Sequence, residues 1–217
     1  MSTAAVTRSR ADLDARLERG LAGLGLVLHQ EARVKLLDYL ILIEKWNQVY
    51  NLTAIRDAEK MISVHLLDSL AVAPHIDGPR VLDVGSGAGL PGIPLAIARP
   101  EFQVILLDSS QKKAAFLKQA VAELQLKNAS VVCERVETWR PAEKFDCIIA
   151  RALGELAEFV ALAKHLLAPA GVLAAMKGVH PLAEIERLPR GFRVKQALPL
   201  SVPGLDAERC LVLLEPA

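Results

Sequence analysis

Residues 81–95, which read VLDVGSGAGLPGIPL, constrain the fold more than any other segment of this chain. A short apolar run is followed by Gly85, Gly87 and Gly89 at alternate positions, and then by two prolines. Glycine lets the backbone turn tightly and approach a ligand that a β-carbon would hold away, and proline is tolerated in the first turn of a helix. The segment therefore predicts a strand, a ligand-binding turn and a helix that begins near Leu90.

Short β-rich runs alternate with segments of helical spacing along the rest of the chain. The runs cover residues 80–85, 102–108, 129–136, 145–150, 171–177, 192–200 and 209–216. Such alternation predicts an α/β fold with a parallel sheet covered by helices. The last two runs are separated by the turn-rich stretch SVPGLDAE, so we expect them to close the sheet as an antiparallel pair.

The first part of the chain has helical spacing throughout. Apolar residues recur three or four apart within residues 13–24 and 34–46, and a third helical segment spans residues 57–74. A chain of 217 residues is long enough for one α/β domain with a small extension. We therefore expect a helical extension over residues 1–78, packed as one structural unit on a core domain over residues 79–217.

Composition limits the possible classes of protein. A formal net charge of +1 and 52% hydrophobic residues argue against a disordered chain and a strongly basic nucleic-acid-binding surface. No apolar run approaches the roughly 20 residues of a membrane helix, and the start MSTAAVTRSR has no apolar signal core, so we expect a cytoplasmic protein without membrane contact. Three scattered cysteines favour buried thiols over disulfides or a metal site. No apolar helix is left over, so we expect a monomer.

The second β-rich run ends in Asp108, beside the predicted glycine turn. Ligands of open α/β sheets bind beyond the carboxyl ends of the strands, where a carboxylate can accept hydrogen bonds from two ribose hydroxyls. Dinucleotides and S-adenosylmethionine share this feature, but the dinucleotide fingerprint requires Gly or Ala where this chain has Leu90. A nucleotide-dependent oxidoreductase is therefore the weaker alternative. A noncatalytic RNA-binding module is a second alternative, which the intact glycine loop and Asp108 oppose.

Seven motifs connect this chain to one family. In order along residues 46–215 they are WNQVYNLTAI, HLLDSL, VLDVGSGAGLPGIPLAI, LLDSSQKKAAFL, RVE, IIARA and MKG. They resemble the ribosomal small-subunit RNA guanine-N7 methyltransferases, also called the glucose-inhibited division protein B family. GLPGIPL is the most specific, because ordinary methyltransferases have no need of a double-proline helix start.

The resemblance implies the fold, the cofactor and the substrate. The implied fold is a Rossmann-like class I methyltransferase with a mainly parallel seven-stranded sheet and an antiparallel last strand. The implied cofactor is S-adenosylmethionine. The implied substrate is a single guanine in the decoding-region loop of 16S rRNA, so the implied partner is the small ribosomal subunit.

The resemblance also implies the roles of residues that follow the strands. Cofactor contacts fall on Gly85, Gly87, Gly89, Leu90, Asp108, Val136, Glu137 and Arg151. The glycine loop would hold the methionine part of the cofactor, Asp108 the ribose, and Val136 and Glu137 the adenine. Arg151 would position the cofactor or the target base and is the predicted catalytic residue.

Substrate contacts are expected at four further residues, Lys177, His65, Asp68 and Asn51. Lys177 ends the fifth strand, at the same edge of the sheet as Arg151. His65 and Asp68 share one helix face, and from the residues alone they form either part of the pocket or a polar network that anchors the helix. Asn51 is either a turn residue or a site residue.

Two basic clusters have open roles, as solvated faces or as contacts to RNA phosphates. They consist of Lys112, Lys113 and Lys118, and of Arg187, Arg190, Arg193 and Lys195.

The chemistry of guanine limits what a methyltransferase site must supply. Ring nitrogen 7 carries an in-plane lone pair and no proton, so its methylation requires alignment with the methyl–sulfur bond and no general base. Methylation of an exocyclic amine uses an Asn/Asp-Pro-Pro-aromatic segment after the fourth strand, where this chain reads IIARALGEL. Methylation of a pyrimidine carbon requires a nucleophilic cysteine, whereas Cys133 and Cys147 fall inside predicted strands. Both rival reactions lose support.

Overall fold

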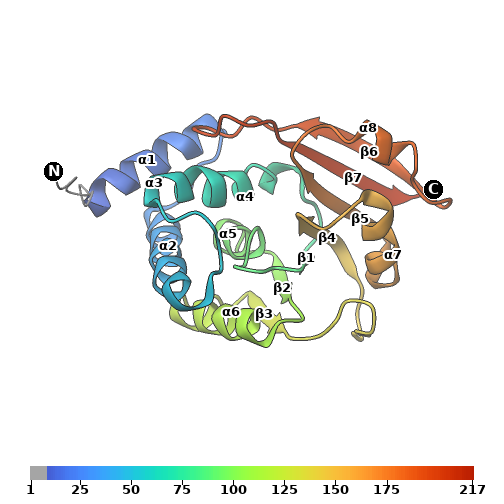
Figure 1. Ribbon diagram of the computed structural model, residues 1–217, viewed down its shortest axis with the longest axis horizontal. Coiled ribbons are helices and arrows are strands. Elements are labelled where there is room, and N and C mark those ends of the chain that lie inside the picture. The colour runs from blue at the N-terminus through green and yellow to red at the C-terminus, as the bar shows by residue number, and fades with distance from the viewer. Residues whose placement is uncertain (1–8) are drawn as a thin grey trace.

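A seven-stranded mixed sheet forms the centre of the molecule (Figure 1). The computed structural model describes residues 9–217. The expectation that the N-terminus has no apolar signal core concerns mainly residues 1–8, which lie outside the described part. The strands are β1 (Arg80–Val84), β2 (Gln103–Leu107), β3 (Ala129–Val132), β4 (Phe145–Arg151), β5 (Leu167–Lys177), β6 (Phe192–Pro199) and β7 (Cys210–Pro216). Their order in the sheet is β3-β2-β1-β4-β5-β7-β6, and β7 runs antiparallel to both of its neighbours, β5 and β6. The predicted fold class and the antiparallel closing pair are confirmed.

Eleven helical segments cover this sheet or extend it at the N-terminus, counted over residues 9–217. They are α1 (Arg10–Gly23), α2 (Gln30–Tyr50), α3 (Ala58–Met61), η1 (Ile62–Leu67), α4 (Asp68–Leu70), η2 (Ala73–His75), α5 (Gly92–Ala98), α6 (Gln111–Glu123), α7 (Leu156–Ala163), η3 (Lys164–Leu166) and α8 (Leu182–Ile185). The third predicted helix of the extension begins, as expected, after Asp57, whose carboxylate accepts the Lys60 amide at 2.9 Å. Its middle part, η1, is a π-helix, which the spacing of apolar residues did not predict.

The two faces of the sheet carry different helices. Side chains alternate along each strand, so Val81 belongs to one buried cluster and Leu82 to the other. The first cluster joins the sheet to α1, α2, α5 and α6, and the second joins it to α7. Figure 1 shows the N-terminal helices, blue to cyan, on the opposite side of the molecule from α7. The extension thus shares one hydrophobic core with the sheet.

The end of β3 differs from the expected one. The run predicted to continue as a strand to Val136 ends at Val132, and the amides of Thr138 and Trp139 then bond to the carbonyl of Arg135 in a turn. Cys133 consequently lies just outside β3 rather than within a strand. The chain leaves the sheet early here and crosses the carboxyl ends of its neighbours.

Within residues 9–217, no helix is both long and apolar enough to cross a bilayer.

Candidate active site

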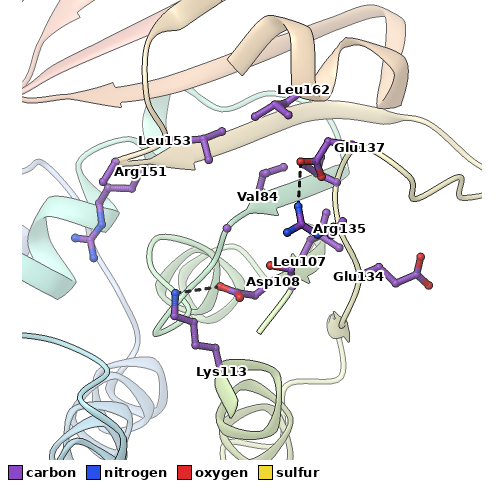
Figure 2. Close-up of a pocket in the computed structure, with 14 residues that line it drawn as sticks. Val84, Leu107, Asp108, Lys113, Glu134, Arg135, Glu137, Arg151, Leu153 and Leu162 are labelled. Carbon is purple, nitrogen blue, oxygen red and sulfur yellow. Dashed lines mark ion pairs between the residues drawn. The ribbon is translucent and has the colours of Figure 1, made fainter. Parts of the chain in front are cut away.

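A cavity of about 340 Å³ opens at the carboxyl ends of β1 to β4 (Figure 2). Parallel strands bring their carboxyl ends to one edge, so residues far apart in the sequence meet here. Five of the residues predicted to bind the cofactor line the cavity: Gly85, Asp108, Val136, Glu137 and Arg151. Figure 2 shows Arg151 and Glu137 at opposite ends, with Asp108 on the floor between them. The cavity has the position and the polar groups that a nucleoside cofactor requires.

Asp108 is held rigidly by the backbone around it. Its side chain is 6% exposed, and its two carboxylate oxygens accept the Gly87 amide at 2.9 Å and the Ser110 amide at 2.8 Å. The ammonium of Lys113 lies 3.7 Å away. Each carboxylate oxygen has a second lone pair, so Asp108 retains two acceptor positions for hydroxyl groups of a ligand. Lys113, whose role the sequence left open between a solvated helix face and a contact to RNA, lines the cavity.

The glycine loop takes its shape from residues in the left-handed region. Gly85, Gly87 and Gly89 have φ values of +68°, +60° and +85°, which side chains other than glycine adopt only with strain. Gly85 is exposed to the cavity, whereas Gly89 is buried beneath it. The glycines thus serve two purposes: Gly85 leaves room for a ligand and Gly89 leaves room for the core.

Replacement of Gly89 by alanine tests that division. A β-carbon at Gly89 would lie 2.5 Å from Ile93 and 3.0 Å from Leu117. Gly191 has a similar φ of +89° and open space around it, so Gly191→Ala measures the backbone strain alone. We expect Gly89→Ala to lower the free energy of unfolding by about 1–3 kcal/mol more than Gly191→Ala in urea titrations. Equal losses would contradict the packing role of Gly89.

The helix after the loop begins later than predicted. Pro91 precedes α5 as its flanking residue and the helix starts at Gly92, two residues beyond Leu90. The Leu90 side chain is 4% exposed and packs in the core, so it does not face the cavity. The sequence departs from the dinucleotide fingerprint at Leu90, but the Leu90 side chain turns inward and would not itself crowd a pyrophosphate in the cavity. A contact of Leu90 with the cofactor, if made, involves its backbone.

Asp83 is a buried carboxylate beneath the glycine loop. It is fully buried, and its Oδ2 atom accepts the Gly92 amide at 3.0 Å. Its Oδ1 atom has no hydrogen-bond partner among the described residues. Burial raises the pKa of Asp83 to about 7, and the bond from Gly92 offsets part of that rise.

The raised pKa of Asp83 predicts a dependence of stability on pH. Between about pH 4 and pH 7 the folded state keeps a proton that the unfolded chain releases, so the stabilisation is full below pH 4 and is lost as pH rises through 7. Asp83→Asn cannot titrate. We expect its free energy of unfolding, relative to wild type, to rise from pH 5 to pH 8 in urea titrations. His65 titrates in both proteins and cancels in the comparison. An unchanged difference would contradict the assignment.

Arg151 connects the cavity to the N-terminal extension. It ends β4, and its Nη1 atom donates to the Val64 carbonyl at 3.1 Å and to Asp68 at 3.2 Å. The Asp68 amide bonds to Ser63, five residues back, where an α-helix would use Val64. The π-helix and the residue that follows it therefore supply the two groups that hold the Arg151 guanidinium, the Val64 carbonyl and the Asp68 carboxylate. Figure 2 shows this guanidinium pointing away from Glu137.

His65, Asp68 and Asn51, predicted to contact substrate, lie outside the cavity lining. His65 bonds through Nε2 to the Thr53 hydroxyl at 2.9 Å, and burial, with Arg151 nearby, lowers its pKa to about 4. Asp68 is buried and joins Arg151 to Arg209. Asn51 ends α2 in the left-handed region, at φ 49°. These positions match the anchoring network and the turn considered from the sequence.

Lys177 lies at the carboxyl edge of β5 as expected, but beside the cavity rather than in its lining. Its ammonium contacts Glu184 at 2.7 Å and the Gly154 carbonyl at 2.8 Å. Glu184 also accepts the Leu156 amide at 2.8 Å. In this structure Lys177 fixes the loop after Arg151.

Two residues of the site were missed by the sequence analysis. The hydroxyl of Tyr39, a fully buried residue of α2, donates to the Ala88 carbonyl in the glycine loop. Arg209, just before β7, bonds to Asp68 at 2.7 Å. Tyr39 lies within a segment of helical spacing that said nothing of its hydroxyl, and no local pattern marked Arg209. Both act across long separations in sequence, where periodicity carries no information.

Comparison with known proteins gives one consistent result. A family model described as rRNA small subunit methyltransferase G matches residues 32–212. A relative named ribosomal RNA small subunit methyltransferase G from Chromobacterium violaceum is 58% identical, covering 91% of this chain and 95% of the relative. A relative of the same name from Nitrosococcus oceani is 57% identical, covering 92% and 94%.

Solved structures support the fold. The glycopeptide N-methyltransferase MtfA complexed with S-adenosyl-L-homocysteine has a TM-score of 0.59 at 14% identity, covering 70% of this chain and 87% of that one. TrmN from Thermus thermophilus has a TM-score of 0.52 at 24% identity, covering 69% and 47%. These structures place the chain in the class I methyltransferase fold.

Proposed function

Because the chain belongs to the rRNA small subunit methyltransferase G family, we propose that it transfers a methyl group from S-adenosylmethionine to nitrogen 7 of one guanine in 16S rRNA. The family match carries the enzyme class, the cofactor and the ribosomal RNA substrate. The choice of nitrogen 7 and of a single guanine in the decoding-region loop is our inference. The observation that carries the proposal is the Asp108 carboxylate, fixed on the cavity floor beside the glycine loop with acceptor positions to spare.

The cavity fits the proposed cofactor part by part. Asp108 would bind the ribose hydroxyls, with its oxygens already oriented by two backbone amides. The segment containing Val136 and Glu137 forms the far wall, where an adenine would lie. Gly85 opens the near end for the methionine part. When bound, the cofactor supplies an electrophilic methyl group on a sulfonium centre.

The residues around the cavity suit positioning better than proton transfer. Nitrogen 7 of guanine has no proton to remove, so the site needs no base with a pKa near neutrality. Arg151 has donors that can bind the neighbouring carbonyl oxygen of guanine, the usual cationic readout of that edge. This contact leaves nitrogen 7 free. The ion pair with the buried Asp68 carboxylate keeps the guanidinium in one orientation.

Cysteine geometry weighs against a pyrimidine substrate. Cys147 lies inside β4, where burial raises the pKa of its thiol far above neutrality. Cys133 is only partly buried but does not line the cavity. A covalent mechanism needs a thiolate facing the base, and neither residue provides one.

The natural substrate is proposed to be the assembled or assembling small subunit, and the enzyme a cytoplasmic monomer. A net charge of +1 supplies little general attraction for free RNA, so shape recognition of a ribosomal particle is the better explanation. Light scattering on the purified protein tests the monomer.

Methyl transfer to small subunits tests the proposal. Subunits from a strain that lacks the gene should accept tritium from labelled S-adenosylmethionine, approaching one methyl group per particle. Subunits from the parent strain, which are already modified, should accept almost none. Equal labelling of both preparations would contradict a single dedicated site.

A further inference from the structure

The Asp68 carboxylate binds two arginines from distant parts of the chain. Its Oδ2 atom accepts from Arg151 at 3.2 Å and its Oδ1 atom from Arg209 at 2.7 Å. The Asp68 side chain is 3% exposed, whereas those of Arg151 and Arg209 are 25% and 23% exposed. The carboxylate is thus buried beneath two guanidinium groups that reach the surface.

One carboxylate cannot neutralise two guanidinium groups, so this cluster keeps a net charge of +1. Arg209 also donates through Nη1 to the Glu208 carbonyl at 2.8 Å. Three guanidinium nitrogens have no hydrogen-bond partner among the described residues: Nη2 of Arg209, and Nε and Nη2 of Arg151. Asp206 and Glu208 are close to Arg209 in sequence, but within residues 9–217 neither forms an ion pair with it. The cluster therefore presents spare, charged donors to an incoming anion.

The cluster also has a defined place relative to the cavity. Arg151 lines the cavity, and Arg209 binds the other oxygen of the same carboxylate. Both guanidinium groups therefore contact one carboxylate, and one of them belongs to a residue that lines the cavity. Both arginine side chains remain partly exposed, so an anion can reach them.

We propose that Arg209 binds a backbone phosphate next to the target guanine, while Asp68 acts as the positioning residue for both Arg209 and Arg151. The proposal rests on the function proposed above, since it requires an RNA substrate. It divides the work between the two arginines: Arg151 positions the base and Arg209 holds the strand that carries it. The β6–β7 connection, which does not line the cavity, thereby becomes part of the RNA-binding surface.

Binding of small subunits at several salt concentrations tests this proposal. Loss of one phosphate contact lowers the slope of log affinity against log salt by about 0.7–0.9, a change that loss of fold does not mimic. We expect Arg209→Gln to bind unmethylated subunits about tenfold more weakly and with that smaller slope. Arg209→Lys should retain the slope, because the charge remains. The affinity of Arg209→Gln for S-adenosylmethionine should equal that of wild type.

Arg10→Gln is the matched control. Arg10 lies at the start of α1, outside both basic clusters, and pairs with Asp38 at 2.7 Å, so its loss also breaks one arginine–carboxylate pair. It should leave subunit affinity and salt slope unchanged. The proposal is overturned if Arg209→Gln binds like wild type, or if Arg209→Gln and Arg209→Lys weaken binding equally and with an unchanged slope. If wild type itself does not bind subunits, the proposed function fails as well.

Discussion

Replacement of Asp108 by alanine is expected to weaken S-adenosylmethionine binding at least 100-fold. The bound cofactor would lose two hydroxyl contacts to the carboxylate, each worth about 1.5–3 kcal/mol as a hydrogen bond to a charged group. The substitution would also leave the Gly87 amide without its partner and loosen the glycine loop. Isothermal titration calorimetry on the purified protein measures the change directly.

Asp12→Ala controls for the general loss of a carboxylate that accepts backbone amides. Asp12 accepts the Ser9 amide at 3.2 Å in the first turn of α1, away from the cavity. It should lower stability slightly and leave cofactor affinity unchanged. Affinity of Asp108→Ala within a factor of three of wild type would remove Asp108 from the cofactor site.

Replacement of Arg151 by alanine is expected to lower kcat for methyl transfer about 100-fold. A misplacement of reacting atoms by about 1 Å costs a factor of this order, and Arg151 is the residue placed to align the base. Asp68 would keep Arg209 as a partner, so the fold should persist. Single-turnover assays with saturating cofactor and small subunits separate this effect from binding.

Arg151→Lys distinguishes charge from geometry. A lysine supplies one point charge and cannot bind Asp68 and a base through a planar fork. We therefore expect kcat of Arg151→Lys to stay well below that of wild type, although its charge is unchanged. Turnover of Arg151→Ala close to that of wild type would show that the base is positioned by other groups.

Much of the fold could be predicted because it depends on local pattern. The change from helical spacing to short β-rich runs marks where the sheet begins, and parallel pairing then brings Asp108 and Arg151 to one edge. The turn-rich stretch before β7 predicted its reversal. These features require only neighbours in sequence and one general rule of sheet topology.

The remaining features depend on contacts that local pattern does not encode. Leu90 packs in the core directly after a loop of glycines with positive φ, and β3 ends at Val132, ahead of the turn at Arg135. The bond from Tyr39 to Ala88 spans 49 residues, and that from Arg209 to Asp68 spans 141. Their existence is decided by how the extension packs on the sheet.

Identification of the methylated nucleoside tests the central claim most directly. Small subunits from a strain lacking the gene are labelled with tritiated S-adenosylmethionine, their RNA is digested to nucleosides, and the labelled product is identified by mass spectrometry. The account predicts 7-methylguanosine, from one position of 16S rRNA. A label on the exocyclic amine of guanine, on a pyrimidine carbon or at several guanines would contradict it.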